Sequence, residues 1–358
     1  MSIYIHIPFC TRICSYCDFS KLIYKSNWAD DYLKSLKQEI LDNYNGELID
    51  TLYIGGGTPS SLSINQLKKL FEIIKIFKLN KNCEITLESN SEDLTEEKLK
   101  FLKKHINRLS IGVQTFNPEV LKTLNRTLNK NNIINAFKYF ENINLDLMYG
   151  FKDENIDRLN KDLEEIIKLN PKHISTYSLI LEKNTKLYIE KYKPISEDLD
   201  RKMYDYIINI LNKNGYIHYE ISNFAKKGYK SKHNLVYWNN KNYYGFGLGA
   251  SGYLNNIRYE NTRNLNNYLK GKYRLNSHKL DLEETISNEI ILNLRKTKGI
   301  NKKEFRKKYN IDIKEIKEIN NLLESKLLKE DKDNIFINEK YLYTSNEILL
   351  KFINLSIK

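Results

Sequence analysis

The stretch CTRICSYCDF, from Cys10 to Phe19, places three cysteines close together at the spacing C-x3-C-x2-C. Thiolates are the ligands that iron–sulfur clusters and zinc prefer. A closed structural zinc site needs four protein ligands, and no fourth Cys or His follows within a few residues, since Cys83 lies far along the chain. Three thiolates on a four-iron cluster would leave one iron open to substrate. The pattern therefore favours such a cluster over three free buried thiols or half of a zinc knuckle.

The residues before the cysteines have the pattern of a β-strand. Isoleucines alternate with polar or aromatic residues from Ile3 to Ile7, and the alternation ends at Pro8. The cysteine loop is therefore expected to leave the carboxyl end of a first strand. Further strands are predicted at 51–54, 83–89, 108–114, 143–150 and from 173 onward. Helices are predicted between them at 28–44, from Ser63, which with Gln66 has the spacing of a capping box, at 95–104 and along 154–170, where apolar residues recur at helical spacing.

Strands that alternate with helices predict an α/β fold with a parallel sheet and helices outside it. The pattern does not decide between an open, doubly wound sheet and a partial barrel. In both architectures ligands bind at the carboxyl ends of the strands. The cysteine loop and the glycine-rich GGGTPS, Gly55–Ser60, both fall at such ends.

The alternation stops after Gly215, which divides the chain into three predicted regions. Residues 1–215 hold the strand–helix units, and residues 216–281 are rich in Tyr, Asn and Gly and are expected to form strands and loops. Residues 282–358 are expected to form three helices, at 284–295, 302–309 and 313–326, and a hairpin near 334–337. This order is typical of a winged-helix-like domain, for which we expect a role in structural packing.

Composition limits the function classes. The 358 residues carry 58 Lys and Arg against 45 Asp and Glu, a net charge of +13. The basic residues are dispersed and form no block, so we expect no nucleic-acid partner, although the charge could help to hold an anionic, propionate-bearing ligand. Four cysteines do not make a disulfide framework. With neither a signal peptide nor an apolar stretch long enough to span a membrane, the sequence predicts a cytoplasmic protein.

The segment YIHIPFCTRICSYCDF, Tyr4–Phe19, resembles the cluster-binding signature of radical S-adenosylmethionine (SAM) proteins. More narrowly, it is similar to that of the oxygen-independent coproporphyrinogen III oxidases and their relatives, the haem chaperones, and the likeness covers nearly the whole chain. The resemblance implies a partial (β/α)6 barrel and a 4Fe-4S cluster on Cys10, Cys14 and Cys17. It also implies that SAM binds at the open iron, where an electron from the cluster can cleave it.

The same resemblance assigns the residues that contact SAM. GGGTPS would hold the amino and carboxylate end of SAM, whereas without the resemblance it is a tight strand–helix turn. Polar residues at or just beyond apolar strands match further SAM-binding positions of the family. Arg126 and Asp146 could instead form a structural ion pair. The segment between these two is shorter than in the family, and Gly150-Phe151-Lys152 replaces the usual Gly-Leu-Pro. The implied contacts are Tyr4, Gly56, Gly57, Thr58, Glu88, Gln114, Arg126 and Asp146.

Two segments of the sequence distinguish the oxidases from the haem chaperones. The oxidases carry a fourth cysteine where this chain has Phe19, and an arm before the first strand, whereas only three residues precede Tyr4. HNLVYW, His233–Trp238, resembles a haem-binding motif of the chaperones, although a lone histidine beside aromatic residues is usually a core histidine. A neutral imidazole can ligate haem iron. We therefore expect a chaperone that carries haem as cargo to an acceptor protein and needs an electron donor if SAM is cleaved. The alternative is a coproporphyrinogen III oxidase.

Overall fold

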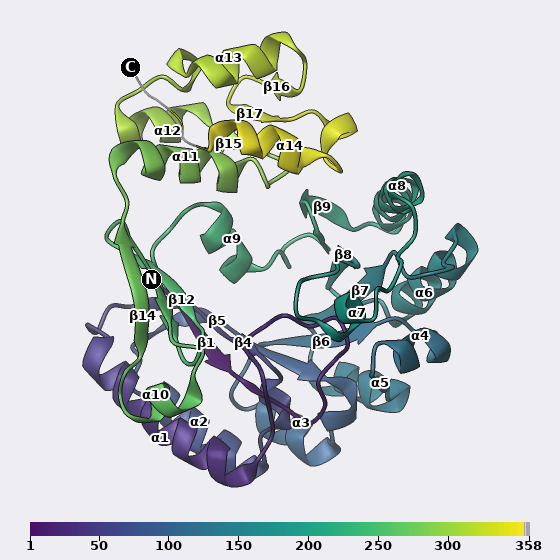
Figure 1. The fold of residues 1–358 in the computed structure, drawn as a ribbon, viewed down its shortest axis with the longest axis vertical. Helices are drawn as coiled ribbons and strands as arrows, with labels where there is room; N and C mark the ends of the chain where they lie inside the picture. Colours follow the sequence, from purple (N-terminus) through teal and green to yellow (C-terminus); the bar gives the residue numbers. More distant parts are fainter. Residues whose placement is uncertain (354, 356–358) are drawn as a thin grey trace.

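One sheet of twelve strands organises the chain in the computed structural model, which describes residues 1–353 and 355 (Figure 1). Its strand order is β14-β13-β12-β11-β1-β4-β5-β6-β7-β8-β10-β9. Each neighbouring pair from β1 to β8 is parallel, and β11 is parallel to β1 on the other side. The parallel strands are β1 (Ser2–Ile7), β4 (Ile49–Gly56), β5 (Leu79–Asn90), β6 (Arg108–Gln114), β7 (Ile143–Tyr149), β8 (His173–Ser178) and β11 (Tyr243–Phe246). The prediction of six parallel strands alternating with helices is confirmed by β1 and β4–β8, and β11 adds a seventh parallel strand.

The two faces of the sheet differ in chemistry. On β4, Leu52 and Ile54 belong to the apolar core, whereas Thr51 and Tyr53, which alternate with them, take part in polar contacts. Helices complete the core, and α2 begins with the capping box predicted at Ser63, whose side chain accepts from the Gln66 N–H. These helices are α1 (Ser26–Asn43), α2 (Ile64–Ile74), α3 (Glu96–Leu102), α4 (Pro118–Thr123), α5 (Lys130–Tyr139), α6 (Ile156–Leu169), α7 (Lys186–Ile189) and α8 (Glu197–Lys213).

Residues 216–281 continue the same sheet at both of its edges. Strands β9 (Ile217–Glu220) and β10 (Asn223–Ala225) join the β8 edge, while β12 (Ser251–Leu254), β13 (Ile257–Asn261) and β14 (Arg274–Lys279) extend beyond β11. The expectation of strands and loops alone was wrong at two places, which form α9 (Lys232–Trp238) and α10 (Leu265–Leu269). The HNLVYW string lies on α9, where the Ser231 side chain caps the helix by accepting from the Asn234 N–H.

The C-terminal region has a three-stranded sheet of its own, and its buried apolar residues join the same core as those of the large sheet. It contains α11 (Leu282–Asn293), β15 (Ile300–Asn301), α12 (Lys302–Tyr309), α13 (Lys317–Glu324), β16 (Leu328–Glu330), β17 (Asn334–Ile337) and α14 (Ser345–Leu349). In Figure 1 this region lies at one end of the molecule, and α9 lies between it and the large sheet. Across the described residues, no helix combines the length and the apolar character needed to cross a membrane.

Candidate cluster and SAM site

The cysteine loop is fixed by backbone contacts on both sides. Its first residues form β2 (Phe9–Cys10), which pairs with β3 (Leu22–Ile23) where the loop ends. Within the loop, the Ser15 N–H donates to the Leu124 carbonyl at 3.0 Å, and the Ser15 carbonyl accepts from the Leu187 N–H at 3.0 Å. The loop is thus held between the end of α4 and α7 by contacts that involve no thiol.

The three cysteines of this loop line one cavity of about 480 Å³. Among the described residues, no three His, Cys, Asp or Glu side chains gather closely enough to hold a single metal ion. Thiolates that bind a four-iron cluster each ligate a different iron, so they surround a space instead of meeting at a point. Burial raises the pKa of Cys10 to about 11 and also raises that of Cys17. Cluster binding therefore has to displace protons from these thiols.

The glycine-rich turn at the end of β4 forms one side of this cavity. Gly56 has φ +118°, in the region that favours glycine. A Cβ on Gly57 would lie 2.8 Å from the Pro8 carbonyl oxygen and 2.9 Å from Cys10 Sγ. Thr58 follows, and its hydroxyl donates to Cys10 Sγ at 3.5 Å. The backbone thus packs directly against the first cysteine, and this glycine cradle has no room for a side chain at residue 57.

Arg126 and Glu88 also line the cavity, although they come from distant parts of the chain. One Arg126 nitrogen, Nη2, donates to Asn90 Oδ1 at 2.7 Å, and the other, Nη1, lies 3.4 Å from Cys14 Sγ. Its Nε is buried and has no hydrogen-bond partner among the described residues. Glu88 accepts from the Tyr53 hydroxyl at 2.6 Å and from the Gly56 N–H at 3.1 Å. A buried donor without a partner and a buried carboxylate are groups that a zwitterionic ligand with hydroxyls would satisfy.

Gln114 and Asp146 complete the polar wall. Gln114 has φ 67° at the end of β6, and its side chain faces the same cavity. Asp146 accepts from Asn144 Nδ2 at 2.7 Å, and burial raises its pKa. Within the described residues Arg126 and Asp146 form no ion pair, so the structural pairing considered for them is absent there. The residues predicted from the two motifs and from the strand ends therefore meet around one space, apart from Tyr4 and His233.

Tyr4 faces a second, smaller cavity of about 330 Å³ that adjoins the first. The two cavities share Gly56, Glu88 and Phe19 in their walls. The Tyr4 hydroxyl lies 3.0 Å from His6 Nδ1. Tyr4 therefore lies beside the main cavity and next to the carboxylate of Glu88.

His233 lines neither of these cavities. Its side chain is 1% exposed, Nδ1 lies 2.8 Å from Thr51 Oγ1, and Nε2 lies 2.8 Å from the Tyr237 hydroxyl. Burial lowers the pKa of this imidazole to about 3, so the ring is neutral. Both ring nitrogens are engaged inside the protein. The role of haem ligand stays a prediction that rests on the resemblance of the string.

The structure adds site residues that the sequence analysis did not name. Asn90 follows Glu88 by two positions on β5, and the period of two in a strand could have placed it on the same face. Tyr53 gave no signal, because it sits in an apolar run. Arg108 is only 2% exposed; burial raises the pKa values of Glu88 and Asp146, and the Arg108 charge opposes this rise in part. In the sequence, the signal for such a role is a basic residue at the start of a buried strand.

The parallel sheet, the three-cysteine loop and the glycine cradle together define a radical SAM protein. The family model of the Radical SAM superfamily matches residues 4–166. Among solved structures, coproporphyrinogen III oxidase (HemN) from Escherichia coli, described as a radical SAM enzyme, is similar with a TM-score of 0.86. The match covers 99% of this chain and 90% of that one at 23% identity, and it shows the likeness of fold.

Relatives with higher sequence identity assign the chain to one family among the radical SAM proteins. Heme chaperone HemW of Lactococcus lactis is 39% identical over 98% of this chain and 97% of its own length. HemW of Bacillus subtilis is 38% identical over 98% and 99%, and HemW of Escherichia coli is 35% identical over 76% of each chain. The chain belongs to the HemW family of haem chaperones. Of the two functions predicted from the sequence, this membership favours the chaperone over the oxidase.

Proposed function

We propose that this chain binds haem and transfers it to an acceptor protein, and that it holds a 4Fe-4S cluster and SAM in the larger cavity. The observation that carries the proposal is the meeting of the three cysteines with the glycine cradle and a buried polar wall, in a chain of the HemW family. The acceptor is a protein of unknown identity, as is the electron donor that SAM cleavage requires. Four free cysteines and a cluster loop suit a reducing compartment, which favours the cytoplasm.

The residues have separate tasks in this proposal. Cys10, Cys14 and Cys17 hold the cluster, and the cradle at Gly57 lets SAM approach it. Arg126 offers its unpartnered Nε to the SAM carboxylate, while Glu88 accepts hydrogen bonds from hydroxyls or the ammonium group. Gln114 and Asp146 add polar contacts, and Tyr4 packs beside them. When bound and reduced, the cluster supplies the electron for reductive cleavage of SAM.

Exposed apolar side chains around the cysteine loop support the haem-binding part of the proposal. The three most exposed large apolar residues in the described part of the chain are Ile189 at 70%, Ile180 at 67% and Phe19 at 65%. Phe19 and Ile180 line the larger cavity, and Ile189 lies on α7, which is bonded to the loop at Ser15. Exposed apolar surface of this kind marks binding sites. A haem macrocycle is apolar, and Arg12 and Lys21 in the same wall could pair with its propionates.

Anaerobic reconstitution with iron and sulfide, followed by two parallel assays, tests the proposal. Haemin added to the reconstituted protein should bind and then pass to an apo-acceptor such as apomyoglobin. Coproporphyrinogen III, supplied with SAM and a reductant, should remain unconverted. Steady conversion of coproporphyrinogen to protoporphyrinogen would establish the oxidase instead. Failure to take up haemin in the presence and absence of SAM would also refute the chaperone.

A further inference from the structure

Helix α9 carries the HNLVYW string, and its first residues are fixed against β4 and β5. The His233 N–H donates to Glu84 Oε1 at 3.1 Å, and the ring bridges Thr51 Oγ1 and the Tyr237 hydroxyl, each at 2.8 Å. Whichever nitrogen carries the proton, neither has a lone pair or a hydrogen left for another partner. Ligation of an iron by His233 would leave a buried hydroxyl of Thr51 or Tyr237 without its partner, which costs free energy.

Contacts of His233 lead directly to the SAM cavity. Its ring stacks with that of Tyr53, with ring centroids 5.1 Å apart and planes 28° apart. The Tyr53 ring also stacks with that of Tyr4, at 6.2 Å, and its hydroxyl donates to Glu88 at 2.6 Å. Tyr237, the second partner of the imidazole, lines the smaller cavity together with Tyr4 and Glu88. Two short paths therefore join His233 to the walls of the cofactor site.

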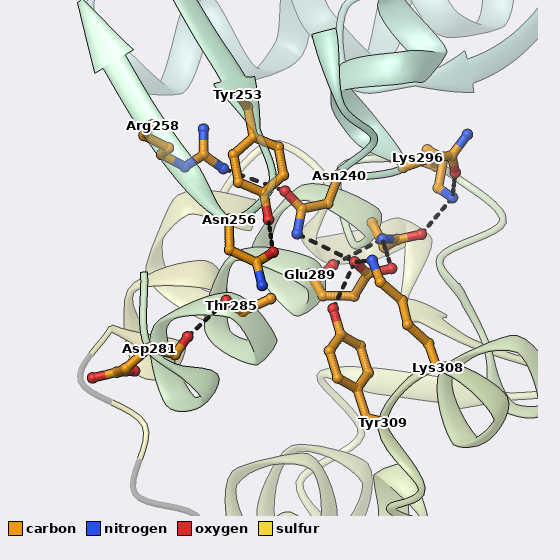
Figure 2. Close-up of polar contacts among 12 residues, drawn as sticks. Asn240, Tyr253, Asn256, Arg258, Asp281, Thr285, Glu289, Lys296, Lys308 and Tyr309 are labelled. Carbon is orange, nitrogen blue, oxygen red and sulfur yellow. Dashed lines mark hydrogen bonds and ion pairs between the residues drawn. The ribbon is translucent and has the colours of Figure 1, made fainter. Parts of the chain in front are cut away.

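The other end of α9 is tied to the C-terminal region. Figure 2 shows Asn240, just beyond the helix, donating to Glu289 Oε2 of α11 at 3.2 Å. Asn239 accepts from Lys296, and the Arg295 guanidinium lies 4.9 Å from the centre of the Trp238 ring. The helix is thus fixed at both ends, and it cannot swing His233 toward solvent without breaking these contacts.

We propose that His233 is a positioning residue of the SAM site, which orients Glu88 through Tyr53 and the wall of the smaller cavity through Tyr237. The string HNLVYW then acts as an internal support, and the haem iron takes its ligand elsewhere. This role rests on the proposed SAM site, and it concerns the shape of the cofactor cavity instead of haem transfer itself. It also explains why a histidine with no access to a cavity packs against two aromatic rings, those of Tyr53 and Tyr237, the first of which stacks in turn on Tyr4.

The test compares His233→Phe, which keeps a flat ring but removes both hydrogen bonds, with the exposed His278→Ala as control. SAM affinity is measured by calorimetry on anaerobically reconstituted protein without haem, and the haemin absorption spectrum on protein without SAM. His233→Phe should weaken SAM binding roughly tenfold, the size of effect typical for residues that orient a ligand-binding group. The haemin spectrum should stay unchanged, and His278→Ala should match wild type in both assays.

A second variant keeps the inference testable if His233→Phe fails to fold. Tyr53→Phe retains the stacked ring but removes the hydrogen bond that stabilises ionised Glu88, so the pH midpoint of SAM binding should rise. In a folded His233→Phe protein the same midpoint should also rise, an effect that a general loss of packing does not produce. An unchanged SAM affinity or midpoint in both variants, or a haemin spectrum altered by His233→Phe, would overturn the assignment.

Discussion

The Thr58 hydroxyl donates to the Cys10 thiol at 3.5 Å, although the two residues lie 48 positions apart in the chain. One belongs to the glycine-rich turn after β4 and the other to the cysteine loop after β1. Parallel pairing of β1 with β4 brings the two loops together, because the pairs His6–Gly55 and Ile7–Gly56 end at the same level. A hydrogen bond from Thr58 to the sulfur also favours the thiolate that an iron requires.

Cluster binding should depend on three of the four cysteines. Replacing Cys10, Cys14 or Cys17 by Ala should abolish the cluster, since each supplies the thiolate of one iron. Cys83→Ala is the matched control, because Cys83 is buried in β5 and does not line the cavity. Iron content and the visible absorption of anaerobically reconstituted protein measure the outcome. Wild-type iron content in any of the first three variants would contradict the assignment.

The glycine cradle should not tolerate a side chain. Gly57→Val would drive carbon atoms into the Pro8 carbonyl and Cys10 Sγ, which lie within 2.9 Å of a Cβ at that position. We expect SAM binding to fall at least tenfold, with loss of cluster as well if Cys10 is displaced. Gly228→Ala is the control: nothing lies within 4 Å of its Cβ, and its left-handed backbone costs only about 1–2 kcal/mol. Equal SAM binding by the two variants in calorimetry would show that the cradle is not the SAM site.

SAM binding should strengthen as the pH rises through neutrality. Burial raises the pKa of Glu88 to about 7, so in the free protein the carboxyl loses its proton between about pH 6 and pH 8. SAM carries a positively charged sulfonium and ammonium, which the ionised form attracts and the protonated form does not. If only the ionised form binds, affinity rises about tenfold over this range. Calorimetry at several pH values measures the slope, and Glu88→Gln should bind weakly at every pH. A slope that persists in Glu88→Gln would assign the titration to another group.

The sequence correctly predicted those elements of the fold whose patterns have a single physical cause. Alternating apolar residues gave β1, and Ser63 with Gln66 gave the start of α2, because strand periodicity and helix capping are local effects. It was also sufficient to bring the cysteines and the glycine turn to one end of the sheet. The segment after Gly215 resisted prediction, since its strands pair with β8 and β1, far away in the chain. No local pattern reveals such pairing.

The side-chain contacts of the candidate site were unpredictable for the same reason. A histidine followed by aromatic residues reads equally well as a ligand or as a core residue, because the sequence does not say where its ring nitrogens point. In the structure they point at Thr51 and Tyr237, which come from separate elements. Asn90 could be inferred from its spacing to Glu88, whereas the hydroxyl of Tyr53 acquires its partner only once β4 and β5 are paired.

The link between α9 and the C-terminal region should depend on Glu289. This carboxylate, whose side chain is 12% exposed, accepts from Asn240 at 3.2 Å, Tyr309 at 3.0 Å and Lys308 at 2.6 Å, as Figure 2 shows. Glu289→Ala leaves these donors without an acceptor, so we expect the free energy of unfolding to fall by roughly 1–3 kcal/mol. Urea denaturation followed by circular dichroism measures the loss, with Glu324→Ala on the exposed side of α13 as the control.

A loss confined to the C-terminal region should appear as a separate early transition, because a small domain can then unfold before the large sheet. Limited proteolysis between Lys279 and Leu282, where β14 ends and α11 begins, should become faster in Glu289→Ala and stay slow in Glu324→Ala. Glu289 lines neither the cluster cavity nor the smaller one beside it, so iron incorporation should be unaffected. Identical denaturation curves for Glu289→Ala and wild type would show that apolar packing, and not this carboxylate, holds the two parts together.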